Sequence, residues 1–282
     1  MDTDSVKQLE TSLKGKEIGH KIHFLNKINS TQNYSRYLLK NCGLPLHGVV
    51  VIAKEQSAGR GRMGRKWISP PGGLWMSIIL QSWLTPKRIP IIQFISALAV
   101  ADSISTLTSL ECTNKWPNDL LVRGKKICGV IVDVDFEGNN ANQAIIGIGL
   151  NANFSANNMN DLENQIKVSR LTTLRDELGY DIHLLNLTKL ILERLEYYYS
   201  LLKEDKIKVI IEIWKKRSDL FGRVVTVEDG KDIFHGLAMG VDDNGVLEIK
   251  LSDGSVREVL FGDVNLSIKP HRLNDQPDLA SN

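Results

Sequence analysis

Short apolar runs separated by polar turns predict strands along much of the chain, while longer stretches that repeat apolar residues at helical spacing predict helices. The predicted strands of the first 217 residues are Ile22–Leu25, Val49–Lys54, Trp75–Gln81, Leu110–Lys115, Leu120–Val122, Lys125–Asp135 and Ala144–Asn151. The predicted helices start near Ser30 and cover Pro90–Ser109, Leu184–Leu202 and Lys206–Arg217. Several strands with short connections and a few helices indicate an α+β fold with a mixed β-sheet flanked by helices.

The pattern changes at about Asp219, where short alternating strands follow one another. They are predicted at Val224–Glu228, Asp232–Val241, Val246–Lys250 and Val256–Leu260. Asn-Gly and Asp-Gly pairs between these strands are typical of hairpin turns, so this part predicts a small SH3-like β-barrel. We therefore divide the chain into an N-terminal tail or docking helix (1–20), a main domain (21–217), a C-terminal barrel (218–270) and a disordered tail (271–282).

Composition excludes several classes of protein. The 282 residues are 42% hydrophobic, which is enough for a substantial core, and 35 Lys and Arg against 33 Asp and Glu leave a net charge of only +2. Global charge therefore gives no reason to expect a nucleic-acid or membrane partner. The three cysteines are far apart and fit a reducing compartment. No secretory signal is recognised and no uninterrupted apolar stretch approaches about 20 residues, so a cytoplasmic protein without a membrane anchor is expected.

Residues 54–67, here called the basic segment, combine glycines with permanent positive charge. Five basic residues against Glu55 give the segment a charge of +4, carried by Lys54, Arg60, Arg62, Arg65 and Lys66, with Gly59, Gly61 and Gly64 between them. Glycines let main-chain N–H groups converge on an anion, and guanidinium groups add forked donors, so the segment predicts binding of a phosphate-bearing ligand. An RNA- or DNA-binding loop is the alternative. Apolar runs on both sides favour a single connection between buried strands over a repetitive tail.

Three further strings concentrate residue types suited to chemistry. They are Lys115-Trp116-Pro117-Asn118-Asp119-Leu120, Lys126-Ile127-Cys128-Gly129 and Ile146-Gly147-Ile148-Gly149-Leu150-Asn151. Each has an ordinary structural interpretation: a turn after a strand, a solvated lysine on an edge strand, and tight packing of backbones. Glycines inside a strand also allow close approach of a ligand.

Together with the basic segment, and in this order, the strings resemble the catalytic domain of biotin protein ligases. The resemblance covers about residues 20–268 and includes Ser30-Thr31 before the first helix of that domain, Leu171-Thr172-Thr173-Leu174, and the C-terminal barrel. It implies a biotin carboxyl-carrier protein ligase that uses ATP and Mg²⁺ to convert biotin to biotinyl-5′-adenylate. The biotinyl group then passes to one lysine of a biotin carboxyl carrier domain of a carboxylase. The first 20 residues are too short for the DNA-binding domain of repressor-type members, so operator binding is not expected.

The resemblance also implies roles for individual residues. Lys126 should bridge the biotin carboxylate and the α-phosphate, with Arg60, Arg62 and Arg65 as further catalytic cations, because two anions must meet. The implied biotin-binding residues are Ser30, Thr31, Gln56, Gly59, Arg60, Lys126, Gly129 and Gly149. The implied nucleotide-binding residues are Arg62, Arg65, Trp67, Asn118, Asp119, Lys126 and Asn151, with Asn118 or Asp119 holding Mg²⁺ directly or through water. Ser30 also suits a helix N-cap, Gly129 and Gly149 should leave room for the ligand rings, and loop 56–73 should close over the adenylate.

Two other functions remain open at this point. A lipoate ligase or octanoyltransferase of related fold would use another carboxylate, although the basic segment paired with Lys-Trp-Pro-Asn-Asp favours biotin. A nucleic-acid-binding module would use the basic segment and the barrel, but the barrel region carries Asp229, Asp232, Asp242, Asp243 and Asp253. By resemblance, an edge strand of the main domain could pair with a carrier domain or with a second ligase in a homodimer.

Overall fold

The computed structural model describes residues 1–43, 45–85, 88–137, 140–157, 171–230, 232–260 and 262–266. Its central sheet is built from β1 (Ile22–Ile28), β2 (Val50–Gln56), β3 (Leu74–Leu84), β4 (Thr113–Lys115), β5 (Asp119–Val122), β6 (Lys125–Glu137) and β7 (Asn140–Leu150). The strand order is β1-β2-β3-β7-β6-β5-β4. β1 runs parallel to β2 and the other neighbouring pairs are antiparallel, so the sheet is mixed, as predicted.

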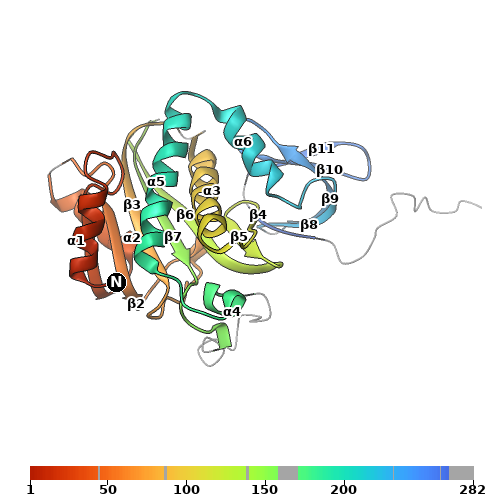
Figure 1. Ribbon diagram of the computed structural model, residues 1–282. Coiled ribbons are helices and arrows are strands. Elements are labelled where there is room, and N and C mark those ends of the chain that lie inside the picture. The colour runs from red at the N-terminus through yellow and green to blue at the C-terminus, as the bar shows by residue number, and fades with distance from the viewer. Residues whose placement is uncertain are drawn as a thin grey trace, which may run out of the picture.

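Helices cover both faces of this sheet. They are α1 (Thr3–Ser12), α2 (Thr31–Asn41), α3 (Ile89–Thr108), α4 (Leu174–Leu178), α5 (Leu184–Lys203) and α6 (Ile207–Lys216). α3 and α5 lie together across one face (Figure 1) and share the main hydrophobic core with it. On the other face, Leu38 of α2 packs in a separate cluster with Val51 and Ile79. The two apolar layers hold the sheet between them and leave its strand ends to carry the site.

The composition of α3 follows from its position. The helix is long and apolar enough to cross a membrane by length and composition, with a mean hydropathy of 1.5, but 67% of that stretch is buried inside the molecule. A helix that is apolar all round belongs in a core, and α3 packs against α5, α6 and the sheet. Gln93 and Asp102 interrupt its apolar residues, so the helix is consistent with the expectation that no uninterrupted apolar stretch approaches about 20 residues.

The first helix is attached to the main domain through its apolar face. Val6, Leu9 and Leu13 are buried in the main core, and α1 packs against α5 and β1. Asp2 caps the helix, because its side chain accepts a hydrogen bond from Ser5 N at 2.9 Å.

The C-terminal part forms a second sheet beside α6 (Figure 1). Its strands are β8 (Val224–Asp229), β9 (Asp232–Val241), β10 (Leu247–Lys250), β11 (Val256–Val259) and β12 (Asp263–Leu266), in the order β11-β10-β9-β8-β12 and all antiparallel. Gly245 has φ +78° in the turn before β10, where Asp242 Oδ1 accepts hydrogen bonds from Asn244 N and Val246 N. The Asn-Gly turn signal in the sequence therefore marks a real hairpin.

Some predicted boundaries were wrong for identifiable reasons. The strand predicted at Leu110–Lys115 shortens to β4 because Leu110 completes the end of α3: its carbonyl accepts from Ser105 Oγ and its N–H donates to Thr108 Oγ1. The short helix α4 and the strand β12 were not predicted. The predicted disordered tail His271–Asn282 and much of the asparagine-rich stretch after Asn151 lie outside the described residues.

Candidate functional site

The basic segment begins in the last residues of β2 and then leaves the strand and folds back on itself. Trp67 N donates to Gly59 O at 2.9 Å and Gly61 N donates to Arg65 O at 2.8 Å, so the loop closes as a narrow hairpin. Gly59 has no space for a side chain, because a Cβ there would lie 2.3 Å from Trp67 O. Glycine is therefore required at position 59 because the loop packs closely on itself there.

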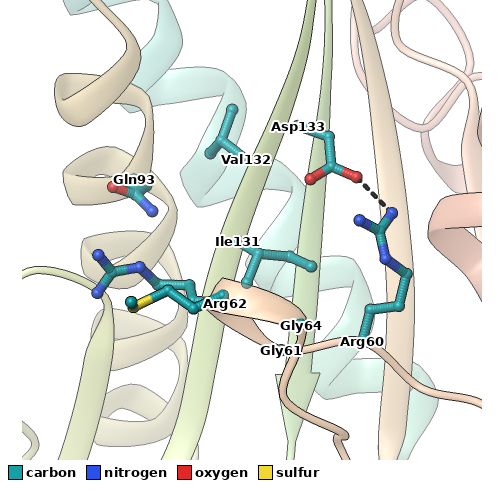
Figure 2. Close-up of a pocket in the computed structure, with 9 residues that line it drawn as sticks. Arg60, Gly61, Arg62, Gly64, Gln93, Ile131, Val132 and Asp133 are labelled. Atoms are coloured by element: carbon teal, nitrogen blue, oxygen red, sulfur yellow. Dashed lines mark hydrogen bonds and ion pairs between the residues drawn. The ribbon is translucent and has the colours of Figure 1, made fainter. Parts of the chain in front are cut away.

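Arg60 turns toward the central sheet. Its Nη1 lies 2.8 Å from Asp133 Oδ2 on β6, and the same oxygen is 2.6 Å from Nη2 of Arg36 on α2. Figure 2 shows Arg60 reaching from the loop to Asp133, with Arg62 on the opposite side of the loop near Gln93. One carboxylate therefore holds the loop against β6 and α2.

Arg62 and Arg65 fasten the loop at two other points. Arg62 Nη1 donates to Asn118 Oδ1 at 3.0 Å, and burial lowers the pKa of the Arg62 guanidinium. Arg65 forms an ion pair with Asp263 at the start of β12, and this hydrogen bond raises the pKa of Arg65. Burial alone would raise the pKa of Asp263, but the hydrogen bond and charge of Arg65 outweigh it and lower that pKa. The C-terminal sheet therefore contacts the loop directly.

A cavity of about 220 Å³ lies between the loop and the central sheet. Residues 60–64 of the loop, residues 131–133 of β6 and Gln93 of α3 form its walls (Figure 2). Arg60 and Arg62 both line the cavity, but Asp133 lines it as well and pairs with Arg60, so the Arg62 guanidinium is the group that suits it to an anion.

Lys126 is placed near the start of β6, where a register shift interrupts its pairing with β5. Its Nζ lies 2.7 Å from Asp119 Oδ1 and 5.0 Å from the centroid of the Trp67 ring, and its side chain is 26% exposed. Bulges commonly aim side chains next to functional sites. Trp67 of the basic segment therefore lies beside Asp119 and Lys126 of two later strings. The structure brings these three predicted residues together in one site.

Gly129 and Gly149 are direct cross-strand partners on β6 and β7. A Cβ at Gly129 would lie 2.8 Å from the Trp67 ring, and one at Gly149 would lie 2.7 Å from it. The Trp67 indole therefore packs on both glycines, in the space that the resemblance assigns to the ligand rings. Trp67 Nε1 is buried without a hydrogen-bond partner in the described part of the chain.

Ser30, Thr31 and Gln56 meet at the start of α2. Ser30 occupies the N-cap position, but its side chain makes no cap hydrogen bond. Instead, Gln56 Oε1 accepts from Thr31 N at 2.8 Å. Ser30 Oγ is left buried without a partner among the described residues. Since an unpaired buried hydroxyl is unfavourable, this atom is suited to a polar ligand group, and the capping role considered for Ser30 is not observed.

Asn151, Asn118 and Asp119 supply oxygen atoms on the predicted nucleotide side. Asn151 Nδ2 donates to Thr172 O at 3.1 Å, while its Oδ1 is buried without a partner in the described structure. Asn118 is buried and Asp119 contacts Lys126. No group of three His, Cys, Asp or Glu that could hold a metal occurs among the described residues. One carboxylate and one amide oxygen still fit Mg²⁺, which keeps several waters and takes its other ligands from substrate phosphates.

The site also contains residues that the sequence analysis missed. Asp133 and Asp263 hold Arg60 and Arg65, and Ser69 and Ser77 contact Gln56 and Thr31. None of these four residues lies in a local pattern that signals its contact, because each partner is distant in sequence. Of the three predicted catalytic arginines, Arg62 is the one whose side chain forms a hydrogen bond to another predicted site residue, Asn118, within the described part of the chain.

Comparison with known proteins identifies the family. Residues 25–151 match the model of the biotin/lipoate A/B protein ligase family, and residues 220–267 match that of the biotin protein ligase C-terminal domain. The bifunctional ligase/repressor BirA of Bacillus subtilis is 30% identical over 263 residues, which cover 93% of this chain and 79% of the relative. The chain belongs to the biotin protein ligase family.

Solved structures agree with this family. The biotin protein ligase of Aquifex aeolicus, in complex with biotin and ATP, is 26% identical with a TM-score of 0.71, and the match covers 88% of this chain and 98% of that one. The Leishmania major enzyme in complex with biotinyl-5-AMP is 25% identical with a TM-score of 0.58, covering 85% and 98%. The family predicted from the four motifs and the α+β fold with its C-terminal domain are confirmed.

Proposed function

We propose that this member of the family activates biotin with ATP to biotinyl-5′-adenylate and transfers the biotinyl group to a lysine of a carboxylase carrier domain. The observation that carries the proposal is the position of Lys126, which lies between Asp119 and the Trp67 ring under the folded basic segment. The 26% identical Aquifex enzyme was solved with biotin and ATP, which supports the same two substrates here.

Activation requires a carboxylate to attack a phosphate. One biotin carboxylate oxygen forms a bond to the α-phosphorus of ATP, and the bond to the bridging oxygen breaks as pyrophosphate leaves. Both reactants are anions, so a fixed cation between them lowers the barrier by offsetting their repulsion and the charge on the phosphoryl oxygens. Lys126 supplies this charge, and Asp119 holds its Nζ in place before substrates bind. Arg62 adds a second, more buried charge next to Asn118.

Asn118 and Asp119 would hold Mg²⁺ together with substrate phosphates. When bound, the ion supplies charge neutralisation along the triphosphate. Asp119 would then contact two cations, the metal ion and the Lys126 ammonium group. Its carboxylate has two oxygens and can bind one with each.

The folded basic segment is suited to retaining the adenylate. A mixed anhydride is lost if water reaches it, so the loop must stay closed until the acceptor lysine arrives. In this structure three arginines fasten the loop to β6, to Asn118 and to β12. Arg60 and Arg65 therefore serve closure through their aspartate partners, in addition to the ligand contacts that the resemblance implies for them.

The open edge of β6 is suited to the protein partner. Among the described residues, the pairing of β5 with β6 ends at Gly129, and Val130 N donates to Asn118 O. Because main-chain groups alternate along a strand, the N–H and C=O groups of Val132 and Val134 face the same open side. An extended segment of a carrier domain, or the same edge of a second ligase, can add a strand there. We propose both pairings, and we also propose that the enzyme is cytoplasmic.

The test is isotope exchange between pyrophosphate and ATP, with biotin, lipoate and octanoate offered separately. Exchange with biotin alone is expected, followed by labelling of a purified biotin carboxyl carrier domain when biotin and ATP are supplied. Exchange with lipoate or octanoate in place of biotin would assign the enzyme to the lipoate branch. Exchange with none of the three acids would contradict the proposed activation step.

A further inference from the structure

A continuous chain of hydrogen bonds runs through the predicted biotin end of the site. Ser77 Oγ donates to Thr31 Oγ1 at 2.8 Å, and Thr31 Oγ1 donates to Gln56 Oε1 at 3.1 Å. Gln56 Nε2 donates to Ser69 Oγ at 2.8 Å, and Ser69 Oγ donates to Trp67 O at 3.1 Å. Five residues from β3, α2, β2 and the end of the basic segment are thus joined in one line.

The direction of this chain is fixed by a single main-chain group. Thr31 N lies 2.8 Å from the side-chain amide of Gln56, and a backbone N–H can only donate, so the Gln56 oxygen must face it. Gln56 Nε2 must then point toward Ser69 and donate to it. Since the Ser69 oxygen accepts from Gln56, its own proton is free for Trp67 O. At the other end, the Thr31 hydroxyl donates to Gln56 and accepts from Ser77.

The two ends of the chain differ in what they are attached to. Ser77 is fully buried (0% exposed) in β3, an inner strand of the central sheet, so its hydroxyl has a fixed position. Ser69 is 3% exposed and follows the basic segment, where it holds the carbonyl of the residue whose indole covers Gly129 and Gly149. In a buried setting such hydrogen bonds are strong and costly to break. The chain of hydrogen bonds therefore connects the central sheet to the loop through Thr31 and Gln56.

We propose that Ser77 and Ser69 are positioning residues that fix which atoms of Thr31 and Gln56 donate and which accept toward biotin. This inference rests on the proposed function, because it assigns the biotin ring to the site formed by Ser30, Thr31 and Gln56. Without the Ser77 hydroxyl, the Thr31 hydroxyl loses its donor and is free to rotate away from Gln56. Without the Ser69 hydroxyl, Gln56 Nε2 and Trp67 O lose their shared hydrogen-bond partner. The Gln56 amide is then held only through its oxygen, by Thr31.

The test uses Ser77→Ala and Ser69→Ala, with Ser96→Ala as the matched control. Ser96 is equally buried (0% exposed), but its hydroxyl donates to Ile92 O within α3. Biotin affinity is measured by titration calorimetry without ATP, and the KM for ATP is measured in pyrophosphate exchange at saturating biotin. Loss of one partner in a buried hydrogen bond predicts about tenfold weaker biotin binding for each of the two variants. The KM for ATP should stay within about twofold of wild type, and Ser69→Thr should restore biotin binding.

Each outcome decides between the alternatives. If Ser77→Ala and Ser69→Ala bind biotin as Ser96→Ala does, the positioning role is refuted. If they weaken biotin and ATP equally, the serines stabilise the fold without setting the biotin site, and the inference again fails. If Ser77→Ala does not fold, Ser69→Ala decides alone, because it lies outside the central sheet. If the wild-type protein itself does not bind biotin, the proposed function is what fails.

Discussion

The ion pair between Arg65 and Asp263 gives the clearest quantitative prediction for loop closure. The side chain of Arg65 is 61% exposed and that of Asp263 is 35% exposed, so solvent screens the pair and its coupling should be on the order of 0.5 kcal/mol. That energy corresponds to about a twofold shift between closed and open loop. Asp263→Asn should therefore double the rate at which the adenylate leaves the enzyme. Because Arg65→Gln also removes the ligand contacts implied for Arg65, its own effect should be at least as large, and adding Asp263→Asn to it should cause no further increase.

The assay follows release of biotinyl-5′-adenylate by rapid filtration, with Asp243→Asn as the control. Asp243 is an exposed aspartate in a turn of the same C-terminal sheet, so this variant removes the same charge without touching the loop. A further twofold increase when Asp263→Asn is added to Arg65→Gln would refute direct coupling. So would a normal release rate in Asp263→Asn.

The pH dependence of this contact has a definite sign. The pKa of Asp263 is lowered from its ordinary value of 3.8. The contribution of the ion pair is therefore complete above that ordinary value and is lost as pH falls through the lower pKa of the folded state. Between pH 6 and 8, release from the wild-type enzyme should not change because of this pair.

Three further variants probe other contacts of the loop. Arg62→Gly removes the bond to Asn118, so free adenylate should escape and label lysines of an added bystander protein; labelling no greater than wild type would show that this contact does not retain the intermediate. Gly149→Ala places a Cβ 2.7 Å from the Trp67 ring, and the forced shift of the indole should slow exchange about tenfold; normal exchange would mean that the indole moves without cost. Asp133→Asn should speed tryptic cleavage of the loop, because Arg60 loses its partner, and an unchanged cleavage rate would contradict a closing role for that carboxylate.

Local sequence pattern predicted the parts of the fold that depend on local physics. Apolar residues at helical spacing predicted α3, and the Asn-Gly pair predicted the hairpin before β10, where Gly245 has the left-handed conformation. Predicted element boundaries were wrong where residues after one element form hydrogen bonds with its end. Leu110 was predicted to begin a strand, but its main chain forms hydrogen bonds with the side chains of Ser105 and Thr108 at the end of α3.

The site was predicted at the level of its motifs and missed at the level of its contacts. Ser30 has the local pattern of a helix cap, yet the hydrogen bond to the first turn comes from Gln56, 25 residues from Thr31. Arg65 meets an aspartate 198 residues away. Such pairs arise from the arrangement of the sheets, and neither partner carries a sequence signal for the other. The motifs could identify the cations, but only the fold shows which anions hold them.

The most direct test of the account is pyrophosphate exchange with biotin in Lys126→Ala, compared with Lys125→Ala. Lys125 is the preceding residue on β6 and is exposed, so its replacement removes the same charge from the neighbouring position. With both variants shown to be folded by circular dichroism, exchange should fall by on the order of 100-fold or more in Lys126→Ala and stay near wild type in Lys125→Ala. Wild-type exchange in Lys126→Ala, or an equal loss in both variants, would contradict the placement of Lys126 at the reacting phosphate.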